Sequence, residues 1–287
     1  MVKKKAIRSK SMYLWKNFFM KNILVPIGIS PEVSNCLQYA IDLAEHFGST
    51  LYIVDAYPSG IPTTSIANVK GILKEKTFNR LKEVIHQVDR KGFDIQYVAQ
   101  NGDLVSAVRS LDRKVHLDMI VVTPQNNDIS DEVFLGKVAG SLIKRTEVPV
   151  MVAPIGARFN PPKRMLWAFK KGQVQNPKTL GPLHVLQKKF KLEIHGLLVK
   201  TPGHRPKDLD MDAAVGATLV TEPTVTSNAT TYQAVLEHFH SHEPDLLTVF
   251  RRERGFFEKL WETNVVYKRE FYCSVPLLVL KHRSQYR

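Results

Sequence analysis

One segment of this chain occurs in two similar copies. Its first copy runs from Asp118-Met119-Ile120-Val121-Val122 to Val148-Pro149-Val150-Met151-Val152, and its second from Asp245-Leu246-Leu247-Thr248-Val249 to Val275-Pro276-Leu277-Leu278-Val279. The Asp and the Pro of the second copy both lie 127 residues after their counterparts, so the spacing between the two strands is the same in both copies. A repeat at this scale predicts two related domains in one chain, and any binding site should be sought in each.

Length and composition agree with two domains. The chain has 287 residues, and its hydrophobic content of 44% allows each half to bury a core. It has two cysteines, Cys36 and Cys273, which predict buried free thiols in a reducing compartment and therefore a cytoplasmic protein. No run of about 18 apolar residues occurs, so we expect no membrane span. We divide the chain into a basic N-terminal extension, a first domain and a second domain, at 1–19, 20–157 and 163–282.

Strand and helix patterns alternate through the first copy, which predicts an α/β fold with a doubly wound parallel sheet. Ser30-Pro31 predicts the start of the first helix, and Gly48 its end. The predicted strands are 22–27, 50–56, 93–99, 118–123 and 148–153. The predicted helices are 31–47, 66–91, 104–115 and 133–145.

The second copy follows the same order but is shorter. Its first and fourth strands are 15 residues closer together than in the first copy, which predicts the loss of the long second helix. The stretch 201–212 is rich in Pro, Gly and Asp and is typical of a loop or a single turn. The predicted strands are 164–169, 192–199, 217–221, 245–250 and 274–280, and the predicted helices are 229–242 and 256–271.

Two segments carry a resemblance to a known family. Met20-Lys21-Asn22-Ile23-Leu24-Val25-Pro26 resembles the opening of the universal stress protein family, and residues 117–152 resemble its closing segment. The resemblance implies a tandem member with two Rossmann-like domains of the adenine nucleotide alpha hydrolase-like type. It also implies a non-enzymatic stress-response or regulatory protein that acts by binding an unknown protein partner. Family members usually dimerise through their last strand, so the two domains are expected to pair within the chain, and a homodimer remains possible.

The resemblance also implies a nucleotide site. Nucleotide-binding members carry Gly-x2-Gly-x9-Gly-Ser/Thr after the fourth strand and an Asp after the first strand. Glycines let the backbone approach phosphates, and the hydroxyl adds a donor. The corresponding positions of the first copy are Gly28, Thr123, Asn126, Gly136 and Lys137. Those of the second copy are Lys170, Phe250, Glu253, Thr263 and Asn264.

Two interpretations of these positions remain open. In the first, both sites are degenerate and neither holds a nucleotide, because the spacing survives while most of the residue types do not. In the second, the first copy keeps a modified pocket for ATP or AMP, with the Gly136 N–H and the Lys137 ammonium near the phosphates. Gly28, Thr123 and Asn126 would then line the rest of that pocket.

Charge is distributed unevenly. The formal net charge is +14, of which residues 1–21 supply seven basic residues and no acid. Residues 22–157 have a net charge of −2 and residues 158–287 a net charge of +9. This asymmetry allows a module that associates with nucleic acid or an anionic membrane surface through the tail and the second domain. Alternatively, the tail is a disordered leader, or translation starts at Met20 instead of Met1.

Catalysis and metal binding find little support in the sequence. It contains no phosphate-binding P-loop, no G-x-S-x-G, no H-E-x-x-H and no C-x-x-C. His238, His240 and His242 alternate near the end of a predicted helix, where only His238 and His242 share a face. We therefore expect solvated histidines, no metal site and no enzymatic activity.

Overall fold

The computed structural model describes residues 19–28, 32–58, 67–124, 136–251 and 275–281. The chain divides into two compact units, of which the first is Met20–Phe159 and the second begins at Asn160. This division falls between the predicted domain boundaries at 157 and 163. Each unit is described below by itself.

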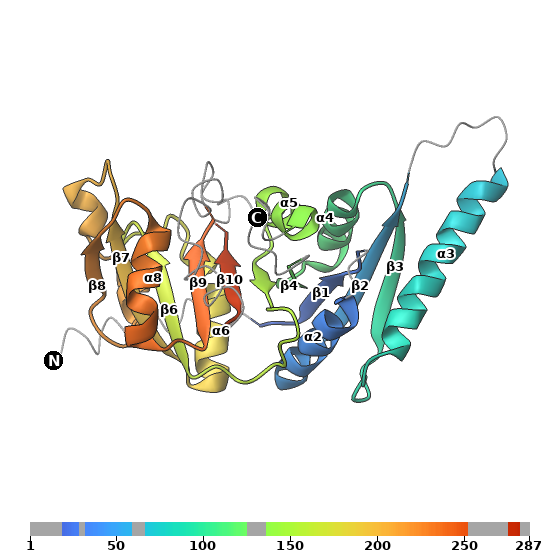
Figure 1. Cartoon of the computed structure of the whole chain (residues 1–287), viewed down its shortest axis with the longest axis horizontal. Coiled ribbons are helices and arrows are strands. Elements are labelled where there is room, and N and C mark those ends of the chain that lie inside the picture. Colours follow the sequence, from blue (N-terminus) through green and yellow to red (C-terminus); the bar gives the residue numbers. More distant parts are fainter. Residues whose placement is uncertain (1–18, 29–31, 59–66, 125–135, 252–274, 282–287) are drawn as a thin grey trace. The chain divides into compact units, whose positions relative to one another are not determined.

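The first unit is an α/β fold around a parallel sheet, as the sequence predicts (Figure 1). Its strands lie in the order β3-β2-β1-β4-β5. The strands are β1 Asn22–Pro26, β2 Thr50–Tyr57, β3 Ile95–Asn101, β4 Met119–Val122 and β5 Val150–Val152. The helices are α2 Val33–Phe47, α3 Ala67–His86, α4 Leu104–Val115 and α5 Gly136–Arg145.

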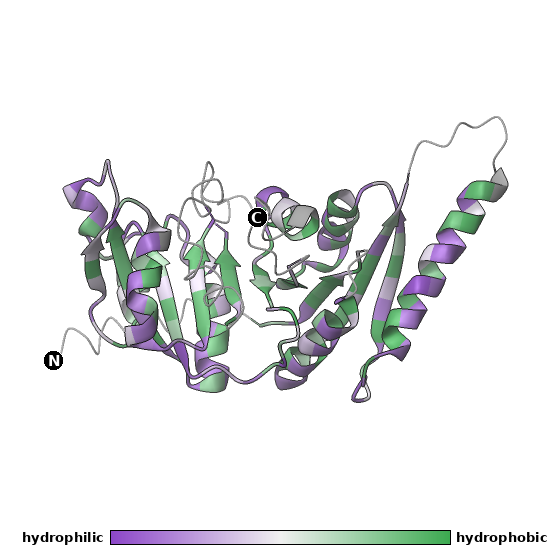
Figure 2. Ribbon diagram, viewed as in Figure 1, coloured by the Kyte–Doolittle hydropathy of each residue, from purple (hydrophilic) through white to green (hydrophobic). Residues whose placement is uncertain are grey.

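Helices cover both faces of this sheet. The contacts of α2 with α3 place these two helices on one face, and those of α4 with α5 place the other pair on the opposite face (Figure 1). The central strands are therefore buried on both sides, and Ile23, Leu24 and Val25 are fully inaccessible to solvent. Continuous apolar runs are typical of strands covered in this way, and Figure 2 shows the strands as mainly hydrophobic.

Capping residues explain where the predicted helix boundaries agree with the structure. Gly48 adopts the left-handed conformation with φ 62° and ends α2, as predicted. The Asp103 carboxylate accepts a hydrogen bond from the Ser106 N–H at 3.1 Å and starts α4 at its predicted residue. However, α2 begins only at Val33 with Glu32 at the N-cap position, later than Ser30-Pro31 predicts. Ser30 and Pro31 lie outside the described residues.

The second unit repeats the strand order of the first. Its strands are also parallel and lie in the order β8-β7-β6-β9-β10. In both units the order is therefore third, second, first, fourth and fifth strand. The strands are β6 Arg164–Phe169, β7 Glu193–Lys200, β8 Thr224–Ser227, β9 Leu246–Phe250 and β10 Leu277–Leu280. The helices are η2 Pro177–Leu180, α6 Gly181–Phe190, η3 Pro206–Leu209, α7 Ala213–Thr218 and α8 Thr231–His242.

One strand of the second unit was placed wrongly by the sequence pattern. The predicted strand 217–221 overlaps α7, and the actual third strand, β8, lies at Thr224–Ser227. The Asp212 side chain accepts from the Val215 N–H at 2.8 Å and so begins a short helix before the apolar residues that suggested a strand. Helix α6 was not predicted, and the predicted helix 256–271 lies outside the described residues.

The connection between the second and third strands differs between the units. In the first unit it contains α3, with 20 residues, whereas in the second it contains the four-residue η3 and the six-residue α7. The position of η3 agrees with the predicted single turn in 201–212. The loss of a helix from a once longer second domain stays a prediction from the spacing.

The repeated Asp has the same structural role in both units. One oxygen of Asp118 accepts hydrogen bonds from the backbone N–H groups of Lys21 at 2.7 Å and Asn22 at 3.0 Å. One oxygen of Asp245 accepts from the corresponding groups of Lys163 and Arg164, both at 2.9 Å. In each unit the carboxylate before the fourth strand thus holds the start of the first strand. The repeat in the sequence is therefore a repeated strand junction.

Candidate functional site

Ligands of open parallel sheets bind at the carboxyl ends of the strands. In the first unit, Gly28 follows β1 and Thr123 follows β4, and these two strands are neighbours in the sheet. The structure therefore brings two of the predicted site residues to one edge. Gly136 and Lys137 are the first two residues of α5. Asn126 and the side chain of Lys137 lie outside what the structure describes.

The described part of this edge offers little to a phosphate. The Thr123 hydroxyl donates to the Ala153 carbonyl at 3.2 Å and so faces its own sheet. A Cβ added at Gly28 would lie 3.8 Å from Cγ2 of Val138, a side chain that is 39% exposed. The position after β1 is thus next to an apolar side chain. At the position after β1, nucleotide-binding members of the family that the sequence resembles carry an Asp. This chain has Gly28 there, with neither a carboxylate nor a close polar neighbour among the described residues.

A buried carboxylate lies elsewhere in the first unit. Asp55 of β2 is 3% exposed and forms an ion pair with Arg80 of α3, while its second oxygen accepts from the Ala56 N–H at 2.8 Å. Burial raises the pKa of Asp55, although the Arg80 guanidinium opposes this shift. Sequence reasoning missed this pair. The only signal was one acid within an otherwise apolar strand.

The corresponding edge of the second unit is chemically different. Lys170 follows β6, at the counterpart of Gly28, and its Nζ donates to Thr201 Oγ1 at 3.0 Å. The next turn packs tightly, because a Cβ at Gly172 would lie 2.5 Å from the Asp210 carbonyl oxygen. Phe250 ends β9, whereas Glu253, Thr263 and Asn264 lie outside the described residues.

Three histidines of the second unit lie close to one another. His238 and His242 share one face of α8, with ring centroids 6.0 Å apart, as the helical spacing predicts. His195 of β7 lies 5.8 Å from His242 by the same measure. In the described ranges, no three His, Cys, Asp or Glu side chains are arranged to hold a metal ion.

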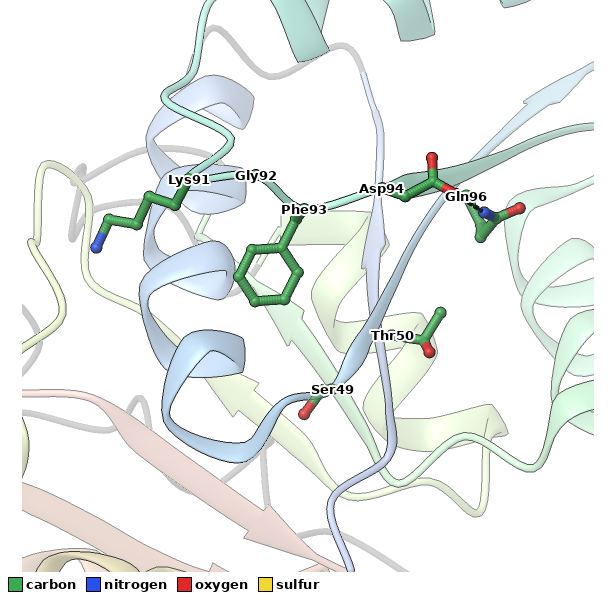
Figure 3. Close-up of a pocket in the computed structure, with 7 residues that line it drawn as sticks. All are labelled: Ser49, Thr50, Lys91, Gly92, Phe93, Asp94 and Gln96. Carbon is green, nitrogen blue, oxygen red and sulfur yellow. Dashed lines mark hydrogen bonds between the residues drawn. The ribbon is translucent and has the colours of Figure 1, made fainter.

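A shallow pocket of about 440 Å³ lies at the opposite, amino edge of the first sheet, where β2 and β3 begin (Figure 3). Its polar groups already have partners: Lys91 Nζ contacts Glu45 at 2.7 Å and Asp42 at 3.0 Å, and Ser49 donates to the Met20 carbonyl. These partners make the pocket a weak candidate for a ligand site. It is lined by Ser49, Thr50, Lys91, Gly92, Phe93, Asp94 and Gln96.

Two further observations bear on the chemistry of the chain. Cys36 is a buried free thiol, as predicted, and burial raises its pKa to about 12, so it is a poor nucleophile. Cys273 lies outside the described residues. Within the described ranges, no helix has both the length and the apolar composition needed to cross a bilayer.

Comparison with known proteins identifies the first unit. Residues 20–154 match the model of the Universal stress protein family, which identifies one domain of that family. A universal stress protein from Archaeoglobus fulgidus DSM 4304 has a similar structure, with a TM-score of 0.66 and 18% identity over 93% of this chain and 98% of its own. A functionally unknown protein from Pseudomonas aeruginosa PAO1 gives a TM-score of 0.56 and 12% identity over 96% of this chain and 94% of its own. No curated protein matches the chain.

Proposed function

We propose that this chain is a tandem universal stress protein, which acts in a stress response by binding and not by catalysis. The observation that carries this proposal is the repeated strand order: the second unit has the sheet of the first, and the first matches the family model. The paired carboxylates Asp118 and Asp245, with equivalent backbone partners, support a common origin of the two units. The likeness to the Archaeoglobus protein over 93% of the chain supports the fold of both.

We further propose that the nucleotide site of the first unit is degenerate. The Thr123 hydroxyl is bonded to the Ala153 carbonyl, and Gly28 is next to the apolar side chain of Val138. A phosphate at this edge would therefore depend on the N-terminus of α5 and on Lys137, which leaves ATP or AMP as the alternative ligand of this unit. Pairing of the two domains through their last strands, a homodimer and a cytoplasmic location are further proposals from the sequence.

Native mass spectrometry of the full chain purified from its own cells tests the ligand part of the proposal. We expect the mass of the protein without a nucleotide, and no saturable binding when ATP or AMP is added at about 1 mM to the same sample. A stoichiometric nucleotide would contradict degeneracy and establish the first unit as a nucleotide sensor. The same spectrum reports whether the chain is a monomer or a homodimer.

The stress-response part needs a separate measurement. We expect the abundance of the protein in its source cells to rise during growth arrest, heat or oxidant treatment. An abundance that stays constant under all three treatments would contradict this part, while leaving the tandem architecture intact.

A further inference from the structure

Strand β3 forms an open edge of the first unit. Among the described strands it pairs only with β2. It is seven residues long, and its sequence contains neither a charged residue nor a proline. Edge strands are usually kept from pairing further by being short or by carrying Lys or Pro. The corresponding edge strand of the second unit, β8, has only four residues. Of these two edges, β3 is therefore the better suited to accept another strand.

The hydrogen bonds to β2 show which backbone groups of β3 point outward. Directly after the strand, the Gly102 N–H donates to the Tyr57 carbonyl of β2 at 2.9 Å. Backbone groups alternate in direction along a strand, so those of Gln96, Val98 and Gln100 also point toward β2. The backbone groups of the residues between them point away from the sheet. These outward-pointing residues are Ile95, Tyr97, Ala99 and Asn101.

Two contacts show which flank of helix α3 faces this open edge. Arg80 forms its ion pair with Asp55 of β2. The Phe78 ring instead contacts the Tyr97 ring of β3, with the ring centroids 5.8 Å apart. At about 100° per residue, Phe78 and Arg80 lie on opposite sides of the buried Leu81. Arg80 therefore marks the flank toward the centre of the sheet, and Phe78 marks the flank toward its edge.

The edge flank of α3 carries a stripe with the spacing of a helix–helix contact. Alternating steps of four and three residues, as in a coiled-coil seam, connect its members, which we call the edge stripe: Gly71, Glu75, Phe78, Lys82 and Ile85. Glu75 and Lys82 are exposed, whereas Phe78 and Ile85 are partly exposed. The edge stripe thus offers a second helix an apolar surface and one charge of each sign.

We propose that the first unit pairs with a second copy of the chain, with β3 antiparallel to β3 about a twofold axis near Tyr97. Tyr97 would lie opposite Tyr97 of the second copy, and Ile95 would lie opposite its Ala99. All of these residues direct their backbone groups outward, so the two edges match in an antiparallel ladder. A twofold axis perpendicular to the sheet also keeps both α3 helices on one face and makes them antiparallel.

The dimensions of the elements allow the strands and the helices to pair together. Helix α3 packs on both β2 and β3, so its axis lies roughly midway between them (Figure 1). In the dimer the two α3 helices would then be two strand spacings apart, or about 10 Å. Packed helices lie about 8–10 Å apart. The edge stripes of the two copies would therefore touch when the strands pair.

The charges of the edge stripe identify a second copy as the partner. Because Phe78 contacts Tyr97, an axis near Tyr97 lies level with Phe78. An antiparallel α3 would then bring Glu75 close to Lys82 of the second copy, and the twofold axis would form this ion pair twice. The Phe78 and Tyr97 rings of both copies would gather around the axis. A surface that complements itself is typical of a twofold dimer.

Sedimentation equilibrium of the full chain over about 1–100 μM tests this proposal. We expect a reversible dimer. Glu75→Lys and Lys82→Glu should each weaken it at least tenfold, because each creates two pairs of like charges across the axis. An equimolar mixture of the two variants should recover dimers of about wild-type affinity, since both ion pairs return with their signs exchanged.

A strand variant and a matched control complete the design. Ala99→Pro removes an outward-pointing N–H and no hydrogen bond to β2, so it should also weaken the dimer at least tenfold. The control, Glu83→Lys, makes the same charge reversal at an exposed residue of α3. Glu83 lies about 80° further around the helix from the edge than Glu75. It should change the affinity less than about twofold. Thermal unfolding of each variant establishes that it is folded.

Several outcomes would overturn the proposal. One is a wild-type chain that stays monomeric over the whole range. Another is a dimer that Glu75→Lys or Ala99→Pro weakens no more than the control does, or that the mixture of charge variants fails to restore. The proposed surface differs from the last strands, β5 and β10, through which the sequence predicts pairing of the two domains. The proposal goes beyond the function proposed above, and its failure would leave the tandem architecture and the degenerate first site unaffected.

Discussion

The repeated Asp is the residue that most clearly connects the sequence to the fold. Asp118 and Asp245 each accept two backbone N–H groups from the chain that enters the first strand of their unit. Those N–H groups lie at the amino edge of the strands: one belongs to the residue before the first strand and the other to the first residue of that strand. A carboxylate satisfies both at once, which explains why an Asp stands before the fourth strand in both units.

We predict that Asp118→Ala destabilises the first unit by about 2 kcal/mol, because two N–H groups lose a charged acceptor. Asp245→Ala should cost about 1 kcal/mol in the second unit, since Asp245 is exposed and water can replace part of the interaction. Urea unfolding followed by circular dichroism measures both. Asp94→Ala is the control, because this exposed carboxylate accepts from the Gln96 side chain and should change stability by less than about 0.5 kcal/mol. Equal stability of Asp118→Ala and the control would contradict the role given to Asp118.

At the scale of the elements, helix α3 is attached to the sheet of its unit through an ion pair with a buried carboxylate. Figure 2 shows that α3 carries hydrophilic residues along much of its length, although Leu81 and Val84 are buried. The ion pair between Arg80 and Asp55 joins the helix to β2. Asp55 loses solvation at this position, and Arg80 is the charge that compensates it.

We predict that Arg80→Leu destabilises the first unit by about 2–3 kcal/mol at pH 7, because it leaves a buried carboxylate without its cation. Burial already raises the pKa of Asp55 above its unfolded value, so stability from this group is greatest below the unfolded pKa and falls as pH rises through the folded pKa. Loss of Arg80 should enlarge this shift and steepen the fall. Unfolding measured between pH 4 and 7 reports the slope.

The control for this prediction removes the carboxylate as well. Asp55→Asn/Arg80→Leu leaves no buried charge, so it should recover most of the stability and lose the added pH dependence. If the double variant is no more stable than Arg80→Leu, the ion pair does not set the stability of α3, and its apolar contacts must do so instead.

The sequence predicts elements well where the deciding interactions are local. Helix α4 begins at its predicted residue because Asp103 caps its first turn, and it ends at its predicted residue, where His116 adopts the left-handed conformation. The pattern fails at α7, where the Asp212 cap starts a helix within an apolar run that also suits a strand. The contacts between Asp55 and Arg80 and between Lys170 and Thr201 join residues 25 and 31 positions apart. Spacing could place Gly28 and Thr123 at one edge, but only the structure showed that the Thr123 hydroxyl faces Ala153.

At the scale of the whole molecule, each unit has five parallel strands and its own buried core. Ile53 of β2 and Leu197 of β7 are both fully inaccessible to solvent, one in each core. Substitution of either by Ala removes buried methyl and methylene groups and leaves a cavity, which costs about 3–4 kcal/mol. We predict that each substitution first destabilises the unit that contains it, because local unfolding follows compact substructures.

Hydrogen exchange followed by mass spectrometry of peptides measures this separately for the two units. In Ile53→Ala, peptides from residues 20–159 should exchange faster at least tenfold, while those from 160–281 stay close to the wild-type rate, and Leu197→Ala should give the reverse pattern. The two variants are each other's controls, since they remove similar volumes from equivalent strands. If either variant accelerates exchange equally in both halves, the two units unfold cooperatively as a single domain. Independent acceleration would instead mean that either unit can open while the other stays folded.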